Sequence, residues 1–201
     1  MPSPRNPALR RGEQVHVRAP RVDDAKAFLA AVRASRVLHA GWVSPPATQA
    51  AFAAYLARFR PPPRGTGEAR HAGVLVARNL DGALVGVLNF SEIVRGAFQS
   101  AYLGYYAFEP HAGQGYMREG LALALEHAFG ALKLHRVEVN IQPDNTRSVA
   151  LVERIGFVRE GYSRRYVKIG GRWRDHVRCA LLAEDWRAAK RRARRAREDA
   201  R

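Results

Sequence analysis

The stretch Pro110–Gly120 reads PHAGQGYMREG and runs directly into LALALEHAF at 121–129. Its glycines and proline predict a loop. Apolar residues then recur every three or four positions, which predicts a helix with one buried face: Met117, Leu121, Leu125, Phe129 and Leu132. Such a loop is either a plain tight turn or a cradle for an anion, because the first helical turn has unpaired N–H donors at the positive end of the helix dipole.

The segments on either side of this loop predict strands. Upstream, HAGVLVAR (71–78), ALVGVLNFSEIV (83–94) and SAYLGYYAF (100–108) are apolar segments separated by turns, as expected of an antiparallel meander. Downstream, HRVEVNI (135–141) alternates apolar and polar residues. A strand, loop, helix and strand in this order form a crossover, which implies a parallel pair. The sequence therefore predicts an α/β fold with a mixed, mostly antiparallel sheet and one central parallel pair.

The N-terminal part predicts one strand and two helices. The strand covers 14–19, and VDDAKAFLAAVRASRVLHA (22–40) is predicted as one helix. A second helix over 48–59 begins at Thr48, a good N-cap. The proline-rich segment 60–68 is predicted to be a mobile surface loop.

The C-terminal part predicts a short helix and a hairpin. Asn145 can cap a helix that ends at Gly156, and residues 160–182 form two strands joined at Gly170 and Gly171. We expect three regions: a disordered segment at 1–13, one domain at 14–186, and a basic tail at 187–201 that forms a solvated or frayed helix.

Composition narrows the class of protein. The chain has 201 residues, 47% of them hydrophobic, which suits one globular domain. No apolar run suggests a membrane span and the N-terminus has no signal-peptide pattern, so we expect a cytoplasmic protein. Cys179 is the single cysteine. His176 lies three residues before it and could assist a reactive thiol, but a buried structural thiol is the favoured interpretation.

The charge favours polyanionic partners. The formal net charge is +16, and the tail holds a disproportionate share of it. An Arg-rich solvated surface explains such a charge, and so does contact with RNA, a ribosome or a phosphate-rich ligand. The histidines are scattered without a paired ligand spacing, so we expect no metal site.

Three kinds of phosphate loop compete for Pro110–Gly120. A P-loop needs Lys and Ser or Thr after its last glycine, but Gly115 is followed by Tyr116 and Met117. A dinucleotide fingerprint needs a third glycine where Arg118 stands. A loop for the diphosphate of coenzyme A needs only glycines and the free N–H groups of a helix start. Without further context, this last reading and a plain turn are about equally favoured.

Several blocks in order resemble the GNAT N-acetyltransferases, in the branch of RimJ and RimL. They are NFSEIVRGAFQSAYLGY (89–105), GQGYM (113–117), HRVEVNIQPDNTRSVALVERIGFVREGY (135–162) and GRWRDHV with DW (171–177 and 185–186). The resemblance covers about Val15 to Trp186 and is closest to the RimJ group. It implies the GNAT fold, whose central parallel strands splay apart, and acetyl-CoA as the donor. It departs from the family loop at Ala112, usually Gln or Arg, and at Met117, usually Gly or Ala.

The resemblance also implies the site residues. Cofactor contacts are expected from Ala107, Phe108, Gly113, Gln114, Gly115, Tyr116, Met117, Arg118 and Asn145. By the RimL mechanism, Glu160 would act as the base through a water, and Ser148 would donate a proton to the departing thiolate. Each could instead be a surface residue. Rival bases are Glu92 and Glu109, and rival acids are Tyr102 and Tyr105.

The function implied by the resemblance is acetyl transfer to a primary amine. The expected acceptor is the N-terminal alanine of a small-subunit ribosomal protein, reached by a monomer or homodimer with ribosomal RNA contacts from the basic surface and tail. Two alternatives remain open at this point. One is acetylation of a small amine such as an antibiotic or polyamine, and the other is a ribosome- or RNA-binding module without catalysis.

Overall fold

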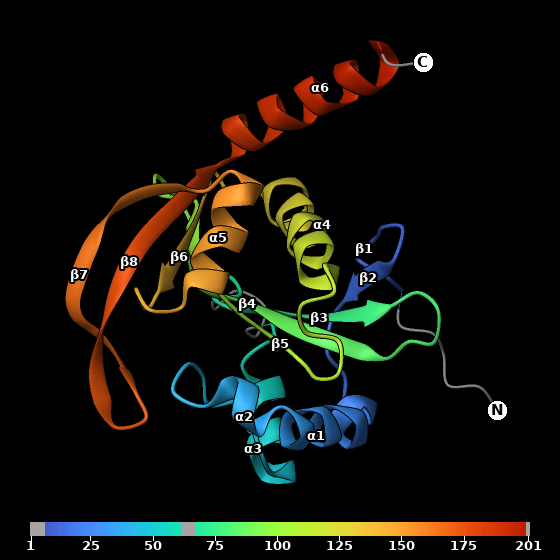
Figure 1. Ribbon diagram of the computed structural model, residues 1–201, viewed down its shortest axis with the longest axis vertical. Helices are drawn as coiled ribbons and strands as arrows, with labels where there is room; N and C mark the ends of the chain where they lie inside the picture. The colour runs from blue at the N-terminus through green and yellow to red at the C-terminus, as the bar shows by residue number, and fades with distance from the viewer. Residues whose placement is uncertain (1–6, 62–66, 200–201) are drawn as a thin grey trace.

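The computed structural model describes residues 7–61 and 67–199 as an eight-stranded sheet with helices on both faces (Figure 1). The strands are β1 (Arg10–Arg11), β2 (Val15–Arg18), β3 (Ala72–Arg78), β4 (Leu84–Val94), β5 (Ser100–Ala107), β6 (Arg136–Ile141), β7 (Val158–Ile169) and β8 (Arg172–Leu182). Their order is β1-β2-β3-β4-β5-β6-β8-β7. The helices are η1 (Val22–Asp24), α1 (Ala25–Ala34), α2 (Arg36–His39), α3 (Gln49–Ala57), α4 (Tyr116–Gly130), α5 (Thr146–Ile155) and α6 (Ala183–Asp199).

The parallel pair is β5 and β6, as the crossover predicts. Its register runs from Ser100 opposite Arg136 to Tyr102 opposite Glu138 and then stops. Both strands continue beyond that point, β5 to Ala107 and β6 to Ile141. The two strands therefore diverge toward their carboxyl ends, and the edge of β5 that faces β6 is open there.

Two hydrophobic cores hold the layers together. In the first, α4 and α5 cover one face of the sheet, and Leu121, Leu125 and Phe129 of α4 are buried against it. In the second, α1 and α3 cover the other face, around Phe28, Phe52 and Phe108. Figure 1 shows these helix layers on opposite sides of the strands. The predicted apolar face of α4 is confirmed, since Met117 and Leu132 also pack against the first core.

The predicted single helix over 22–40 is wrong, because it divides into η1, α1 and α2, and the break between α1 and α2 is at Ser35. Ser35 is fully buried, and its Oγ donates to the Ala31 carbonyl at 2.7 Å. The same Oγ accepts from the Glu109 N–H at 2.9 Å. A serine that bonds backbone groups in this way competes with the helical ladder. The break turns α2 so that His39 points back to the end of β5.

The first residues are more ordered than predicted. Residues 1–6 lie outside the described range, but Arg10 and Arg11 form β1 and pair with β2. The Gly12 N–H donates to the Val15 carbonyl at 2.9 Å and closes the turn between them. The edge of β2 offers a row of backbone partners, and these order a segment whose composition alone suggests disorder. Most of the predicted 60–68 loop, residues 62–66, also lies outside the described range.

The basic tail is the outer part of α6. This helix begins at Ala183, before the predicted boundary, and Trp186 packs against the first core. Lys190 forms an ion pair with Glu126 of α4, and the helix then projects away from the sheet (Figure 1). In the described ranges, no helix combines the length and the apolar character needed to cross a bilayer.

Candidate active site

A cleft of about 1330 Å³ opens where β5 and β6 diverge. Its walls come from the end of α2, the ends of β5 and β6, the loop before α4, the first turns of α5, and the β7–β8 hairpin. It passes from the face of the sheet covered by α4 and α5 toward the face that carries α2. One ligand can therefore enter from each face and meet the other at the opening in the sheet.

The loop before α4 has the geometry expected of an anion cradle. Gly113 has φ 80° and Gly115 has φ 85°, a left-handed conformation that only glycine adopts without strain. The backbone N–H groups of residues 113–117 donate no backbone hydrogen bond within the described chain. They lie at the N-terminus of the fifteen-residue helix α4, where the dipole adds positive potential.

The two unusual loop positions, Ala112 and Met117, have structural explanations. The Gln114 side chain donates to the Pro110 carbonyl at 2.8 Å and so braces the loop, a role that a polar residue at 112 would otherwise offer. The Met117 side chain packs against β4 at Gly86, where a Cβ would overlap its sulfur. Both substitutions leave the N–H groups of the loop available.

The structure brings most of the predicted cofactor residues together. The following line the cleft: Ala107, Gly113, Gly115, Met117, Arg118 and Asn145. Phe108 lies outside the lining, because its side chain is fully buried in the second core and its N–H donates to the Val85 carbonyl at 2.9 Å. Gln114 and Tyr116 also lie outside the lining.

Positive side chains line the cleft into which the loop opens. Arg118 on α4 and Arg147 and Arg154 on α5 line the same cleft. Asn145 caps α5 by accepting from the Ser148 N–H at 3.2 Å, so its side chain is fixed at the mouth. Glycine-cradled N–H groups, guanidinium groups and an open strand edge fit the phosphates and the amide arm of coenzyme A.

Ser148 and Tyr105 meet in the cleft. The Tyr105 hydroxyl donates to the Ser148 carbonyl at 3.0 Å, and both residues are part of the lining. Burial raises the pKa of Tyr105 to about 12, so its hydroxyl keeps its proton at neutral pH. Tyr102 lies elsewhere, with its hydroxyl 3.5 Å from that of Tyr166.

The predicted carboxylate bases lie outside the cleft lining. Glu160 on β7 is exposed and forms a two-point ion pair with Arg136, which lowers the pKa of Glu160. Glu92 pairs with Arg70 at 2.5 Å. Glu109 is exposed beyond the end of β5. A carboxylate held by a guanidinium, as Glu92 and Glu160 are, is a weakened base.

None of the three histidines in the described lining, His39, His111 and His176, was predicted as a site residue. His39 is 5% exposed and donates from Nε2 to the Ala107 carbonyl at 2.8 Å. His176 is 3% exposed on β8. It does not assist Cys179, because residues three apart in a strand point to opposite faces. Cys179 is buried in the first core, as predicted, and burial raises its pKa. The alternation of β8 was the signal that could have placed His176 on the other face.

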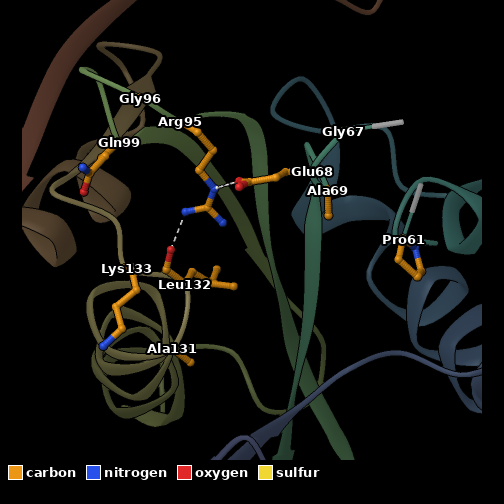
Figure 2. A pocket seen from close by; sticks show the side chains of 10 residues that line it. All are labelled: Pro61, Gly67, Glu68, Ala69, Arg95, Gly96, Gln99, Ala131, Leu132 and Lys133. Atoms are coloured by element: carbon orange, nitrogen blue, oxygen red, sulfur yellow. Dashed lines mark hydrogen bonds and ion pairs between the residues drawn. The ribbon is translucent and has the colours of Figure 1, made fainter. Parts of the chain in front are cut away.

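A second hollow of about 700 Å³ lies at the opposite end of α4 (Figure 2). Its centre is Arg95, which pairs with Glu68 at 2.6 Å and donates to the Leu132 carbonyl at 2.5 Å. Helix α4 has fifteen residues and spans about 22 Å, so this hollow is separate from the cleft. None of the predicted site residues lines it. Among the described residues, no group of three or more His, Cys, Asp or Glu side chains could hold a metal.

Comparison with known proteins agrees with this geometry. Residues 14–158 match the acetyltransferase (GNAT) domain family. The chain belongs to the GNAT acetyltransferase family. The structure of Mycobacterium smegmatis RimJ in complex with CoA-disulfide superimposes with a TM-score of 0.76 and 30% identity, over 85% of this chain and 82% of that one. The predicted GNAT fold is thus confirmed.

Curated relatives match over shorter lengths. The "Probable N-acetyltransferase YjcK" of Bacillus subtilis is 41% identical over 59% of this chain and 64% of its own length. The ribosomal protein uS5-alanine N-acetyltransferase of Escherichia coli is 44% identical over 51% and 53%. A spermidine N(1)-acetyltransferase of Vibrio cholerae is 31% identical over 49% and 57%. This chain therefore matches between about half and two thirds of the length of these relatives.

Proposed function

We propose that the protein transfers the acetyl group of acetyl-CoA to a protein N-terminal α-amine, with the N-terminal alanine of a small-subunit ribosomal protein as acceptor. The observation that carries the transfer is the cleft itself, in which the N–H cradle before α4 opens onto the gap between β5 and β6. The acceptor is supported by the name of the Escherichia coli relative and by the likeness to RimJ.

The charge of the cleft supports an α-amine over a polyamine. Among the described lining residues, Asp144 is the single acidic one, whereas three are arginines: Arg118, Arg147 and Arg154. A polyamine is a multiple cation and needs carboxylates to replace its water, whereas an α-amine has a pKa near 8 and is about one-tenth neutral at pH 7. The acceptor wall instead offers Trp42, which can cover a small side chain such as that of alanine.

The residues of the chain then have distinct tasks. The bound donor supplies an acetyl thioester. Gly113 and Gly115 hold its diphosphate with backbone donors, and Asn145 contacts the amide arm. Ser148 donates a proton or hydrogen bond to the departing sulfur, and Tyr105 fixes the backbone of Ser148 through the 3.0 Å bond to its carbonyl. Glu160 has no role in this proposal, because Arg136 holds it outside the lining.

Thiol release from acetyl-CoA tests the acceptor. The panel contains short peptides that begin with free alanine, the same peptides with a blocked N-terminus but an internal lysine, and spermidine. We expect the free-alanine peptide to be preferred by kcat/KM over spermidine by tenfold or more. Preference for spermidine would support the alternative suggested by the Vibrio cholerae relative. Failure to bind acetyl-CoA in calorimetry would support a binding module without catalysis.

Contact with ribosomal RNA is a further part of the proposal. Beyond Lys190, α6 exposes Arg191, Arg192, Arg194 and Arg195 while projecting from the sheet (Figure 1). Replacing these four by Gln keeps Trp186 and the Lys190–Glu126 pair. We expect the variant to bind ribosomes more weakly and with a shallower dependence on salt, because each lost phosphate contact reduces counterion release. An unchanged salt slope would contradict this contact.

A further inference from the structure

We infer that His176 is the general base that removes the proton from the acceptor amine. The inference rests on the proposed amine acetylation. None of the predicted carboxylate bases is part of the described lining of the cleft. His176 is part of that lining, and its side chain is buried, with 3% exposure. Pairing of β8 with β6 places the neighbouring Val177 opposite Ile141, the last residue of β6. His176 therefore lies at the point where the sheet opens.

Strand alternation sets the face from which His176 acts. Val177 and Cys179 belong to the first core beneath α4 and α5, so His176 and Arg178 point to the other face. Asn140 is opposite Arg178 and shares that face, and it also lines the cleft. The cradle before α4 holds the donor from one face, and His176 meets the acceptor from the other. A base is needed on the acceptor side, because the amine is the group that loses a proton.

The hydrogen bond of His176 determines which nitrogen can act. Nδ1 lies 3.0 Å from the Arg174 carbonyl oxygen. A carbonyl only accepts, so Nδ1 carries the proton and the lone pair of the neutral ring is on Nε2. The backbone of the same strand thus orients the ring and fixes its tautomer. His39 differs, because its Nε2 bonds to Ala107 and its Nδ1 is buried in the described structure without a partner.

The surroundings keep the ring of His176 neutral. Burial lowers the pKa of His176, against smaller raising effects of its bond to Arg174 and the charge of Asp175. Tyr166 on β7 presents its ring with centroids 6.0 Å apart. Strand alternation places Arg174 and Arg178 of β8 on the same face as His176. Ser163 of β7 pairs with His176, and Asn140 of β6 pairs with Arg178. A neutral imidazole at pH 7 is ready to accept a proton.

The neutral amine forms the new C–N bond to the acetyl carbon while one of its N–H protons passes to His176 Nε2. The C–S bond breaks, and the sulfur leaves as a thiol after taking a proton from Ser148 or water. His176 then passes its proton through water to the group that protonated the sulfur, which restores the starting state. The products are an amide and a free thiol, and no oxidant or further reactant is needed.

The pH dependence of kcat/KM tests this role, since it reports the free enzyme and the free substrate. Ionisation of the α-amine gives log kcat/KM a slope of one below about pH 8. His176 adds a second ionisation, so the wild-type slope should increase to two below the pKa of its ring, which lies under 6.5. A wild-type profile whose slope stays at one below the ring pKa found by NMR would overturn the inference without any variant.

His176→Gln should lose kcat/KM by 100-fold or more at pH 7, within the range for general bases, and should keep a slope of one at all acidic pH values. Its dissociation constant for CoA should stay within twofold of wild type. His135→Gln is the matched control, because His135 is half-exposed before β6 and bonds to Glu184 at 3.4 Å. Glu160→Gln, His39→Gln and His111→Gln test the rivals, since His39 and His111 also line the cleft. Loss of the second ionisation in any of these, with its retention in His176→Gln, would refute the assignment.

An NMR titration separates this inference from the proposed function. Long-range ¹H–¹⁵N spectra of the wild type should show His176 as the Nδ1–H tautomer with a pKa below 6.5. If the wild type acetylates no amine but shows this tautomer, the proposed function fails and the base assignment fails with it. If it acetylates small amines instead of peptides, the acceptor proposal alone fails. The Nε2–H tautomer would overturn the inference in every case.

Discussion

Replacing Gly115 by alanine should weaken CoA binding without a comparable loss of stability. Gly115 is the N-cap of α4 at φ 85°, and an added Cβ would have no heavy atom within 4 Å. The cost of the methyl group is therefore conformational and not steric. A left-handed conformation costs an L-residue about 1–2 kcal/mol. Because the loop is exposed, the free variant can relax to negative φ and avoid most of this cost.

Ligand binding must then restore the strained conformation, because only that geometry aims the N–H groups of the loop at one diphosphate. A cost of about 1–2 kcal/mol corresponds to a roughly 5- to 30-fold higher dissociation constant. Calorimetric titration with CoA measures this constant directly. Thermal unfolding of the free variant measures the remaining effect on stability, which should be small.

Gly82→Ala is the matched control. Gly82 lies in the β3–β4 turn at φ 75°, also with nothing within 4 Å of an added Cβ. It carries the same backbone penalty but lies in a turn that does not line the cleft. Its dissociation constant for CoA should equal that of wild type. Equal CoA affinity in Gly115→Ala and wild type, or an equal loss in both variants, would refute the role of the loop as the diphosphate cradle.

Three further outcomes follow from the packing and the titrating groups. Gly120→Ala should lower the free energy of unfolding measured in urea by about 1–3 kcal/mol, because the new Cβ would lie 2.7 Å from Val76 Cγ1 in the core. Gly130→Ala is the control: its Cβ would meet only the flexible end of Arg10, at 3.3 Å, so the free energy of unfolding should change little. Tyr105→Phe should lose about 1 kcal/mol of stability with its bond to Ser148, and should lower kcat more than CoA affinity; an unchanged kcat would remove Tyr105 from the site. The free energy of unfolding should fall on acidification from pH 7 to pH 5, because burial lowers the pKa of His176 and the unfolded chain then binds a proton that the native state does not bind. His176→Gln should lose less stability over this range, and an equal loss would contradict the buried neutral ring.

The local pattern of the sequence determined most of the fold. The glycines of 110–120, the apolar face of α4 and the alternation of β6 fix a strand, a loop, a helix and a strand without reference to distant residues. The parallel pair follows from this order. The glycine loop before α4 could be predicted for the same reason, because its N–H donors and left-handed glycines belong to one continuous segment.

Tertiary structure decided the acceptor side of the site. The sequence favours Glu160 as the base and does not single out His176 as one, but strand register places Arg136 against Glu160 and places His176 at the end of β6. The break at Ser35 likewise depends on Glu109, which is far away along the chain. These choices rest on contacts between separate elements. A local pattern gives the face of each strand, but the partners that charge, bury or orient a side chain are set only when the strands pair.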